Sequence, residues 1–226
     1  MMKEEEKLYT KELYDLSHTA AAPLLEGTTY PWEALPQIGA FIRELGAGLS
    51  LEEYDHPQED VWIHKTAKIY PNNFIAGPCV IGAGTEVRPG AFIRGNALVG
   101  ENCVVGNSTE LKNVILFDNV QVPHYNYVGD SILGYHAHMG AGAVTSNVKQ
   151  DRTLVTVKTP EGRLETGLKK FGAILGDHVE VGCNSVLNPG TVVGRGSRVY
   201  PLSMVRGLVP EGHVYKNAGE IVEIHY

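Results

Sequence analysis

A branched aliphatic residue recurs every six positions along most of the chain. The first run consists of Ile63, Ile69, Ile75, Ile81, Val87, Ile93, Val99, Val105 and Leu111. After shortened steps the spacing returns at Leu116, Val122 and Val128, at Leu133 and Met139, and from Leu175 to Val205. An α-helix repeats every 3.6 residues and cannot produce this period. The pattern is typical of a solenoid built from hexapeptide units.

The period has a direct structural interpretation. Each hexad forms a short strand and a corner, and three hexads close a triangular turn of about 18 residues, with the aliphatic residue inside. A smaller residue stands two positions earlier, where the wall turns, in Ala67, Asn73, Cys79, Thr85, Ala91, Ala97, Cys103 and Thr109. Stacked turns pair as parallel strands about 4.8 Å apart. The sequence therefore predicts an all-β protein, a parallel β-helix of about seven coils.

The N-terminal residues 1–58 lie outside the repeat and carry helical patterns instead. One pattern covers Glu4–Leu16, and the other covers Trp32–Leu45, opening after Pro31. We expect this helical segment to cap the end of the β-helix or to pack on its side.

The β-helix itself is predicted over residues 59–217, followed by a C-terminal tail over 218–226. Residues 148–172 interrupt the coils, and within them Thr153–Lys158 and Arg163–Thr166 flank a Thr-Pro-Glu-Gly turn. This pattern predicts a projecting hairpin arm. Long excursions from a regular solenoid are often functional, although a surface decoration would look the same.

Composition excludes several classes of protein. The 226 residues include 19 Lys and Arg against 26 Asp and Glu, a net charge of −7, which argues against a general nucleic-acid binder. No apolar run approaches the length of a membrane span, and the start, MMKEEEK, lacks the apolar stretch of a signal peptide. The three cysteines are too widely spaced for a disulfide framework or a CxxC metal site. We expect a cytoplasmic protein.

Alternation along the wall gathers polar residues on one ridge. With Leu111 inside, Glu110 and Lys112 point outward, and Tyr127 lies above Glu110 one coil later. His124 and Arg88 are expected at the corner that leads into the same face. Such a cluster on an acidic chain is consistent with an anion site beside a general base, although solvated wall residues would give the same pattern.

Four motifs in register resemble one enzyme family. They are Arg88-Pro89-Gly90, the Gly-Asn-Ser-Thr-Glu-Leu-Lys that ends at Lys112, the His-Tyr-Asn-Tyr-Val-Gly-Asp that starts at His124, and the Gly-Ala-Gly-Ala-Val-Thr-Ser-Asn that ends at Asn147. They are similar to the acetyltransferase domain of the bacterial bifunctional glucosamine-1-phosphate acetyltransferase and N-acetylglucosamine-1-phosphate uridyltransferase. The resemblance implies a left-handed β-helix, a homotrimer, acetyl-CoA as co-substrate and an amino-sugar phosphate as acceptor.

The resemblance also implies roles for individual residues. His124 falls on the catalytic base and Glu110 on a carboxylate that orients it. The substrate-binding positions are Arg88, Lys112 and Lys170 for the sugar phosphate, with Tyr127 and His138 for the sugar. The coenzyme A positions are Ala141, Asn147, Val148, Cys183 and Pro201.

Three departures from the family pattern concern the acceptor sugar and the site. The family's sugar-contacting asparagine is His138 here, Pro123 stands where the family has glycine, and Cys183 replaces a serine. The glycine-rich start of a uridyltransferase half is absent from the sequence.

Two other interpretations stay open. The chain could be a non-catalytic sugar-nucleotide-binding module or the accessory half of a sugar-phosphate nucleotidyltransferase. A zinc enzyme resembling γ-class carbonic anhydrases would need histidine ligands, and the candidates His124, His136 and His138 lack the expected spacing. We therefore predict no metal site.

Overall fold

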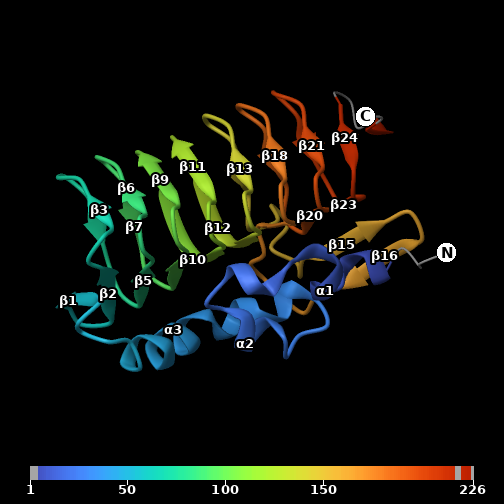
Figure 1. Ribbon diagram of the computed structural model, residues 1–226. Coiled ribbons are helices and arrows are strands. Elements are labelled where there is room, and N and C mark those ends of the chain that lie inside the picture. Colours follow the sequence, from blue (N-terminus) through green and yellow to red (C-terminus); the bar gives the residue numbers. More distant parts are fainter. Residues whose placement is uncertain (1–4, 217–219, 225–226) are drawn as a thin grey trace.

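Short parallel strands stack into an elongated β-solenoid, with the N-terminal segment along one side (Figure 1). This computed structural model describes residues 5–216 and 220–224. One face of the solenoid consists of β3 (Lys68–Ile69), β6 (Glu86–Val87), β9 (Val104–Asn107), β11 (Gln121–His124), β13 (His138–Met139), β18 (Glu180–Val181), β21 (Arg198–Val199) and β24 (His213–Tyr215). These strands pair with one another in parallel, one strand per turn.

The other two faces are joined in one sheet because β10 (Glu110–Leu116) and β12 (Tyr127–Leu133) each run through a corner. One of these faces is completed by β2 (Val61–His64), β5 (Cys79–Ile81), β8 (Ala97–Val99), β17 (Ala173–Leu175), β20 (Thr191–Val193) and β23 (Leu208–Val209). The other is completed by β4 (Phe74–Ile75), β7 (Phe92–Ile93), β14 (Val144–Thr145), β19 (Val186–Leu187) and β22 (Met204–Val205).

The solenoid is longer than the seven coils that the sequence predicts, since eight parallel strands succeed one another on the first face. The repeat continues beyond Val205: Val209 stacks on Val193, and Tyr215 stacks on Val199. The strand β25 (Ile221–Glu223) then pairs antiparallel with β24, within the expected tail. Residues 218–219 and 225–226 of the expected tail lie outside the described residues.

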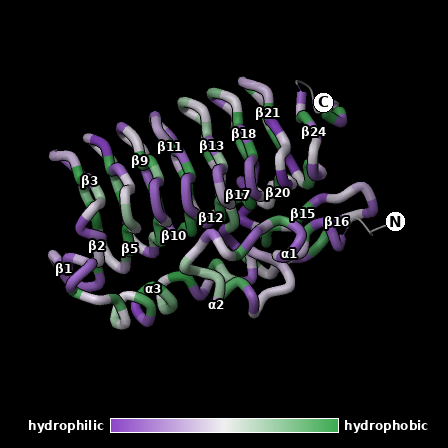
Figure 2. Tube along the Cα trace, viewed as in Figure 1, coloured by the Kyte–Doolittle hydropathy of each residue, from purple (hydrophilic) through white to green (hydrophobic). Residues whose placement is uncertain are grey.

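The predicted interior is confirmed. The side chains that the hexad spacing places inside are fully buried in the middle turns, namely Ile81, Val87, Ile93, Val99, Val105 and Leu111. At the start of the solenoid Ile69 is 37% exposed, because no further turn covers it. Hydrophobic and hydrophilic segments alternate along the turns in Figure 2.

Each corner places one residue per turn in the left-handed region of backbone conformation. Along the corner that follows the first face these residues are Asn72, Gly90, Ser108, Tyr125, Gly142, Asn184 and Leu202. Positive φ lets the chain change direction between two strands within a few residues. This column of turns fixes where the residues just before it, including His124, lie on the wall.

The N-terminal segment is less helical than the sequence predicts. It contains η1 (Glu6–Leu8), α1 (Thr10–Leu13), η2 (Leu16–His18), α2 (Ala22–Leu25), η3 (Pro31–Gln37), α3 (Ile38–Ala47) and the strand β1 (Tyr54–Gln58). The expected helix over Glu4–Leu16 is wrong in extent, because Tyr14 is extended and buried with its ring on Phe117 of the solenoid. The second pattern begins as a 3₁₀ helix around Pro36 and becomes α-helical from Ile38.

The segment packs along the side of the solenoid rather than over its end. Helix α3 contacts β5, β8 and β10, and β1 pairs antiparallel with β2. Gly46 is needed on α3 because a side chain there would overlap the ring of Trp62. No helix among the described residues is long and apolar enough to cross a membrane.

The excursion after β14 contains an antiparallel hairpin of β15 (Thr156–Thr159) and β16 (Gly162–Glu165). Its first strand does not project freely, since it contacts β20 and β23 and the side chains of Val155 and Val157 are fully buried. The hairpin therefore lies against the C-terminal turns of the solenoid (Figure 1).

Candidate functional site

His124 ends β11 at the corner of the solenoid and is exposed. Its main chain is held on both sides: the N–H donates to Oδ1 of Asn126 (3.1 Å), and the carbonyl accepts from Gly142 N (2.9 Å). Its imidazole forms no hydrogen bond with any of residues 5–216 or 220–224. The fold thus fixes the position of His124 and leaves its ring nitrogens open to a ligand.

Glu110 stands on β10, in register with Tyr127 of the turn above, as the hexad spacing predicts. Its carboxylate accepts a hydrogen bond from Nη1 of Arg94 at 2.7 Å, and this interaction raises the pKa of Arg94. The expected contact between Glu110 and His124 is therefore not formed in this structure. An arginine of the turn below holds the carboxylate instead.

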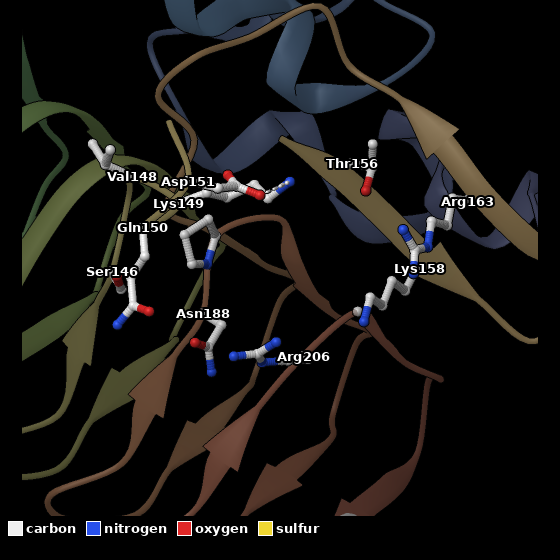
Figure 3. Close-up of a pocket in the computed structure, with 12 residues that line it drawn as sticks. Ser146, Val148, Lys149, Gln150, Asp151, Thr156, Lys158, Arg163, Asn188 and Arg206 are labelled. Carbon is white, nitrogen blue, oxygen red and sulfur yellow. Dashed lines mark ion pairs between the residues drawn. The ribbon is translucent and has the colours of Figure 1, made fainter. Parts of the chain in front are cut away.

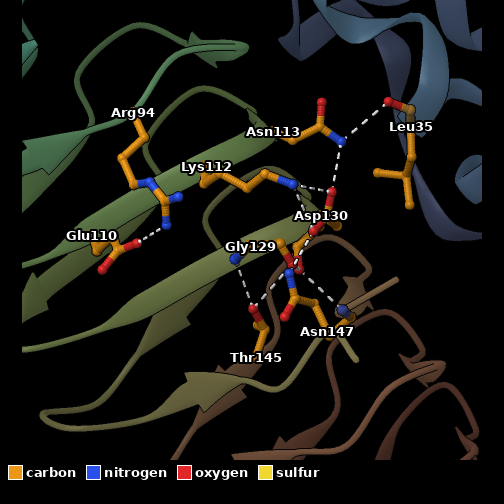
Figure 4. Close-up of polar contacts among 11 residues, drawn as sticks. Leu35, Arg94, Glu110, Lys112, Asn113, Gly129, Asp130, Thr145 and Asn147 are labelled. Atoms are coloured by element: carbon orange, nitrogen blue, oxygen red, sulfur yellow. Dashed lines mark hydrogen bonds and ion pairs between the residues drawn. The ribbon is translucent and has the colours of Figure 1, made fainter. Parts of the chain in front are cut away.

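Lys112 and Asp130 form the polar centre of this face (Figure 4). The Nζ of Lys112 donates to both carboxylate oxygens of Asp130, at 2.9 and 3.1 Å. Asp130 is buried, and it also accepts hydrogen bonds from the amides of Asn113 and Asn147. Lys112, expected to bind phosphate, is thus already paired with a carboxylate.

Tyr127 lies half-buried between these two ion pairs. Burial, and next the nearby Asp130 and Glu110 carboxylates, raise the pKa of the phenol. Its ring lies so close to Gly129 that a side chain at that position would overlap the phenol oxygen. The hydroxyl of Tyr127 therefore stays protonated at neutral pH and can donate a hydrogen bond.

The two residues that follow Lys170 in sequence form main-chain hydrogen bonds with Asn147 and Asp130. Phe171 N donates to Asn147 O (3.0 Å), and Gly172 N donates to Asp130 O (2.8 Å). The side chain of Lys170 is exposed and forms no ion pair within the described part of the chain. Arg88 lies apart from this group, after β6, where Nε is 3.3 Å from Oε2 of Glu86.

Three of the residues expected to contact coenzyme A stack on His124. Gly142 N donates to His124 O, Asn184 N to Ala141 O and Leu202 N to Cys183 O, at 2.8–2.9 Å. His124, Ala141, Cys183 and Pro201 thus occupy the same corner in successive turns; we call this set the corner column. Cys183 is exposed there. Asn147 and Val148 lie elsewhere, after β14, with Asn147 bonded to Asp130.

The other histidines do not join His124. His138 faces outward on β13, with Nδ1 2.7 Å from Oε2 of Glu180, and the ring of His136 stacks on that of His178 at 5.6 Å between centroids. His138 is therefore not beside Lys112 and Tyr127 within this chain. In the described ranges, no group of three or more His, Cys, Asp or Glu side chains is arranged to hold a metal ion.

Sequence reasoning missed two members of the site, Arg94 and Asp130, as partners of Glu110 and Lys112. A signal for them existed, since one turn spans about 18 residues: Lys112 and Asp130 are 18 residues apart, and Arg94 precedes Glu110 by 16. Residues at that spacing lie on adjacent turns. The hexad register thus contains the information, although it does not indicate which neighbours pair.

Comparison with known proteins gives one family and several relatives. Residues 75–195 match the family model described as the GMPPB C-terminal domain. The chain is 36% identical over 192 residues to the bifunctional protein GlmU of Methanococcus aeolicus, covering 76% of this chain and 46% of that protein. It is 33% identical over 156 residues to a bifunctional sugar-1-phosphate nucleotidylyltransferase/acetyltransferase of Sulfurisphaera tokodaii, covering 69% and 39%. The chain therefore spans less than half the length of these relatives.

Solved structures resemble the chain more distantly. A structure of AntD, an N-acyltransferase from Bacillus cereus, in complex with dTDP and coenzyme A, aligns over 77% of this chain and 91% of its own. The sequence identity is 18%, and the TM-score is 0.40.

Proposed function

We propose that this chain, a member of the family of the GMPPB C-terminal domain, transfers an acetyl group from acetyl-CoA to the amine of an amino-sugar phosphate. It is related to the hexapeptide-repeat acetyltransferases of the GlmU type. The observation that carries this proposal is the corner column. The imidazole of His124 has no hydrogen-bond partner among the described residues, and the column continues from it into Ala141, Cys183 and Pro201, of which Cys183 and Pro201 are exposed. A thioester lying along this column would bring its carbonyl to His124.

The chemistry requires one proton acceptor. As the sugar amine attacks the thioester carbonyl, a C–N bond forms, and neutral His124 accepts the proton that the nitrogen loses. The tetrahedral intermediate then expels the coenzyme A sulfur, and the C–S bond breaks. The departing thiolate takes the proton back from His124, so the imidazole is restored and no acyl-enzyme forms.

The acceptor's phosphate would be held by Lys112 and Lys170, with Tyr127 donating to the sugar. Lys170 is exposed and unpaired among the described residues, so it meets the phosphate without losing an ion pair. Lys112 keeps Asp130 as its partner and offers its remaining donor. Ammonium groups bind phosphate through charge-assisted hydrogen bonds. Arg88 is not part of this grip within one chain, because it lies after β6 beside Glu86.

We also propose that the chain assembles into a homotrimer with sites between the subunits, and the outer surface of the face that contains β4, β7, β14, β19 and β22 supports this. An outward row in register contains Phe74, Phe92, Glu110, Tyr127, Val144, Val186 and Met204. Phe74 and Met204 are 55% and 61% exposed, and Phe92 and Val186 are also exposed. The exposed apolar side chains at the two ends of this row, Phe74 and Phe92 at one end and Val186 and Met204 at the other, favour contact with another copy of the chain.

One observation favours the second candidate, a non-catalytic accessory half of a sugar-phosphate nucleotidyltransferase. Glu110 and Lys112 are both engaged in ion pairs, so this chain does not show the base-orienting contact expected of the enzyme. The matched family model is also that of a C-terminal domain. A scaffold needs the surface of the solenoid and does not need His124.

The deciding experiment measures release of the coenzyme A thiol from acetyl-CoA in the presence of a panel of amino-sugar phosphates. We expect release with at least one acceptor and a loss of about 10²–10⁴ in rate for His124→Ala. His56→Gln, on the exposed edge strand β1, is the matched histidine control and should keep the rate. Absence of release with every acceptor, together with unchanged ligand affinity in His124→Ala, would establish the accessory role instead.

A further inference from the structure

A pocket of about 400 Å³ separates the hairpin from the C-terminal turns of the solenoid (Figure 3). Its walls come from three segments: the loop after β14, the hairpin β15–β16, and the turns that hold Asn188 and Arg206. None of the residues expected to bind the acceptor sugar lines it, whereas Val148, one of the positions expected to contact coenzyme A, does. Its size falls within the usual range of small-molecule sites.

The pocket concentrates positive charge on an acidic chain. Lys149, Lys158, Arg163 and Arg206 line it against one carboxylate, that of Asp151. Lys149 is the cation that Asp151 approaches, at 3.6 Å. Lys158, Arg163 and Arg206 form no ion pair with any residue that the structure describes.

Two of these cations repel one another. Lys158 of β15 lies directly opposite Arg163 of β16 in the antiparallel register. Like charges at opposed positions destabilise a hairpin. The carboxylate that lines the pocket, that of Asp151, lies near Lys149 and forms no ion pair with Lys158 or Arg163. An anion bound between the hairpin and Arg206 would remove that repulsion.

Backbone contacts hold these cations in place. At Gly190 and Gly207 a side chain would run into the carbonyls of Thr156 and Lys158, so β15 lies directly on these two turns. Both glycines have positive φ. Arg206 immediately precedes Gly207. The close approach of Gly207 to the carbonyl of Lys158 therefore places the backbone of Arg206 next to β15. The pocket is therefore formed by packed backbone and not by flexible side chains alone.

We propose that this pocket binds the phosphate groups of a nucleotide. An arginine pair presents planar donors that match phosphate oxygens, and a lysine adds a point charge. Thr156, whose hydroxyl forms no hydrogen bond with any described residue, also lines the pocket. Binding of a nucleotide sugar here is independent of acetyl transfer, whereas binding of the coenzyme A nucleotide rests on the proposed function. The nucleotide could be the 3′,5′-ADP end of coenzyme A or the nucleoside diphosphate of a nucleotide sugar, because both present the same phosphate chemistry.

The test is isothermal titration of the full chain with inorganic pyrophosphate. We expect saturable binding that weakens about tenfold or more in Arg206→Gln and in the double variant Lys158→Gln/Arg163→Gln. Arg198→Gln, which removes one cation from the distant β21 strand, should bind as the unmodified chain does. Circular dichroism and thermal unfolding verify that each variant folds.

Parallel titrations with 3′,5′-ADP and with UDP identify the source of the phosphates, since the natural ligand should bind more tightly than pyrophosphate. Citrate serves as the anion control that lacks phosphate. The proposal is overturned if pyrophosphate does not bind, if citrate binds equally well, or if the Arg206 and hairpin variants bind as tightly as the unmodified chain.

Discussion

Oε1 of Glu110 lies 2.7 Å from Nη1 of Arg94, so the carboxylate best placed to orient a catalytic histidine is held by an arginine of the turn below. Glu110 therefore holds Arg94 rather than His124 within one chain. Because Glu110 does not touch the imidazole, removing its carboxylate should leave the position of that ring unchanged within one chain.

We expect Glu110→Gln to lower kcat by less than about tenfold, well below the 10²–10⁴ attributed to a general base. The acid limb of the kcat/KM profile against pH should stay in place. Steady-state assays across pH 5–9 measure both quantities. A displacement of the acid limb towards lower pH would show that Glu110 contacts His124 in the assembled enzyme.

A variant of Asp130 tests how much the buried ion pair with Lys112 contributes to stability. Its buried carboxylate accepts from Lys112, Asn113 and Asn147. Asp130→Asn keeps the shape and tolerates the left-handed backbone, with φ +48, but leaves Lys112 without its counter-ion. We expect the free energy of unfolding to fall by about 1.5–3 kcal/mol, the usual range for hydrogen bonds to charged groups.

Denaturant unfolding followed by circular dichroism measures this loss. Asp55→Asn is the control, since Asp55 is exposed on β1 and its replacement should change stability by less than about 0.5 kcal/mol. Equal stability of the Asp130 and Asp55 variants would mean that the Lys112–Asp130 pair contributes nothing to the fold.

The hexad spacing predicts the interior because the aliphatic residue of each hexad must point into the centre of the triangular turn to be buried. Leu111 and Val128 are in register and fully buried. Their neighbours Glu110 and Tyr127 lie side by side on the outer surface of adjacent strands, as expected. The sequence predicts a shorter solenoid because the step from Val205 to Val209 is only four residues and breaks the spacing before Tyr215 resumes it.

The partners of the polar residues could not be predicted in the same way. Period and alternation place Arg94, Glu110 and Lys112 on one wall, but several arrangements of their charges fit that wall. Which pairs form depends on side-chain reach and on burial, as in the choice of Asp130 by Lys112. The predicted helix over Glu4–Leu16 is wrong in extent for a related reason. Contacts with the solenoid, including that of Tyr14 with Phe117, override a short helical pattern.

Cys183 provides a probe of the corner column. It is exposed, whereas Cys79 and Cys103 are buried, and burial raises the pKa of both buried thiols to about 12. At pH 8 iodoacetamide should therefore alkylate Cys183 alone in the folded chain, because the thiolate is the reactive form. If coenzyme A lies along the column, saturating acetyl-CoA should slow this labelling by about tenfold or more.

Mass spectrometry of tryptic peptides identifies the labelled residue, and Cys183→Ser should take up no label in the folded state. Labelling of Cys183 at an unchanged rate under saturating acetyl-CoA would place the cofactor away from this corner.

The outward apolar row predicts the effect of a charge on assembly. Met204 is 61% exposed and in register with Val186, so Met204→Glu places a carboxylate in the surface that another copy should cover. Burying an unpaired charge costs several kcal/mol, so the proposed trimer should dissociate to single chains in this variant. Light scattering after size-exclusion chromatography measures the mass. Leu51→Glu, at an exposed residue of the N-terminal segment, is the control and should leave the trimer intact.

Asp177 gives a prediction for pH and stability with a definite sign. Burial raises its pKa from 3.8, despite hydrogen bonds from Asp15 N and Tyr135 N and the charge of Arg195. The folded chain therefore holds this proton more tightly than the unfolded chain does. The resulting stabilisation is fully present below the unfolded value and is lost as pH rises through the higher folded value.

Asp177→Asn cannot titrate in that window, so the difference in unfolding free energy between the unmodified chain and this variant should decrease as pH rises from about 3.5. Urea unfolding at closely spaced pH values measures the difference, and Asp55→Asn provides the exposed reference. If the difference instead grew with pH, the ion pair with Arg195 would outweigh burial, and the carboxylate would be stabilised in its charged form by the fold.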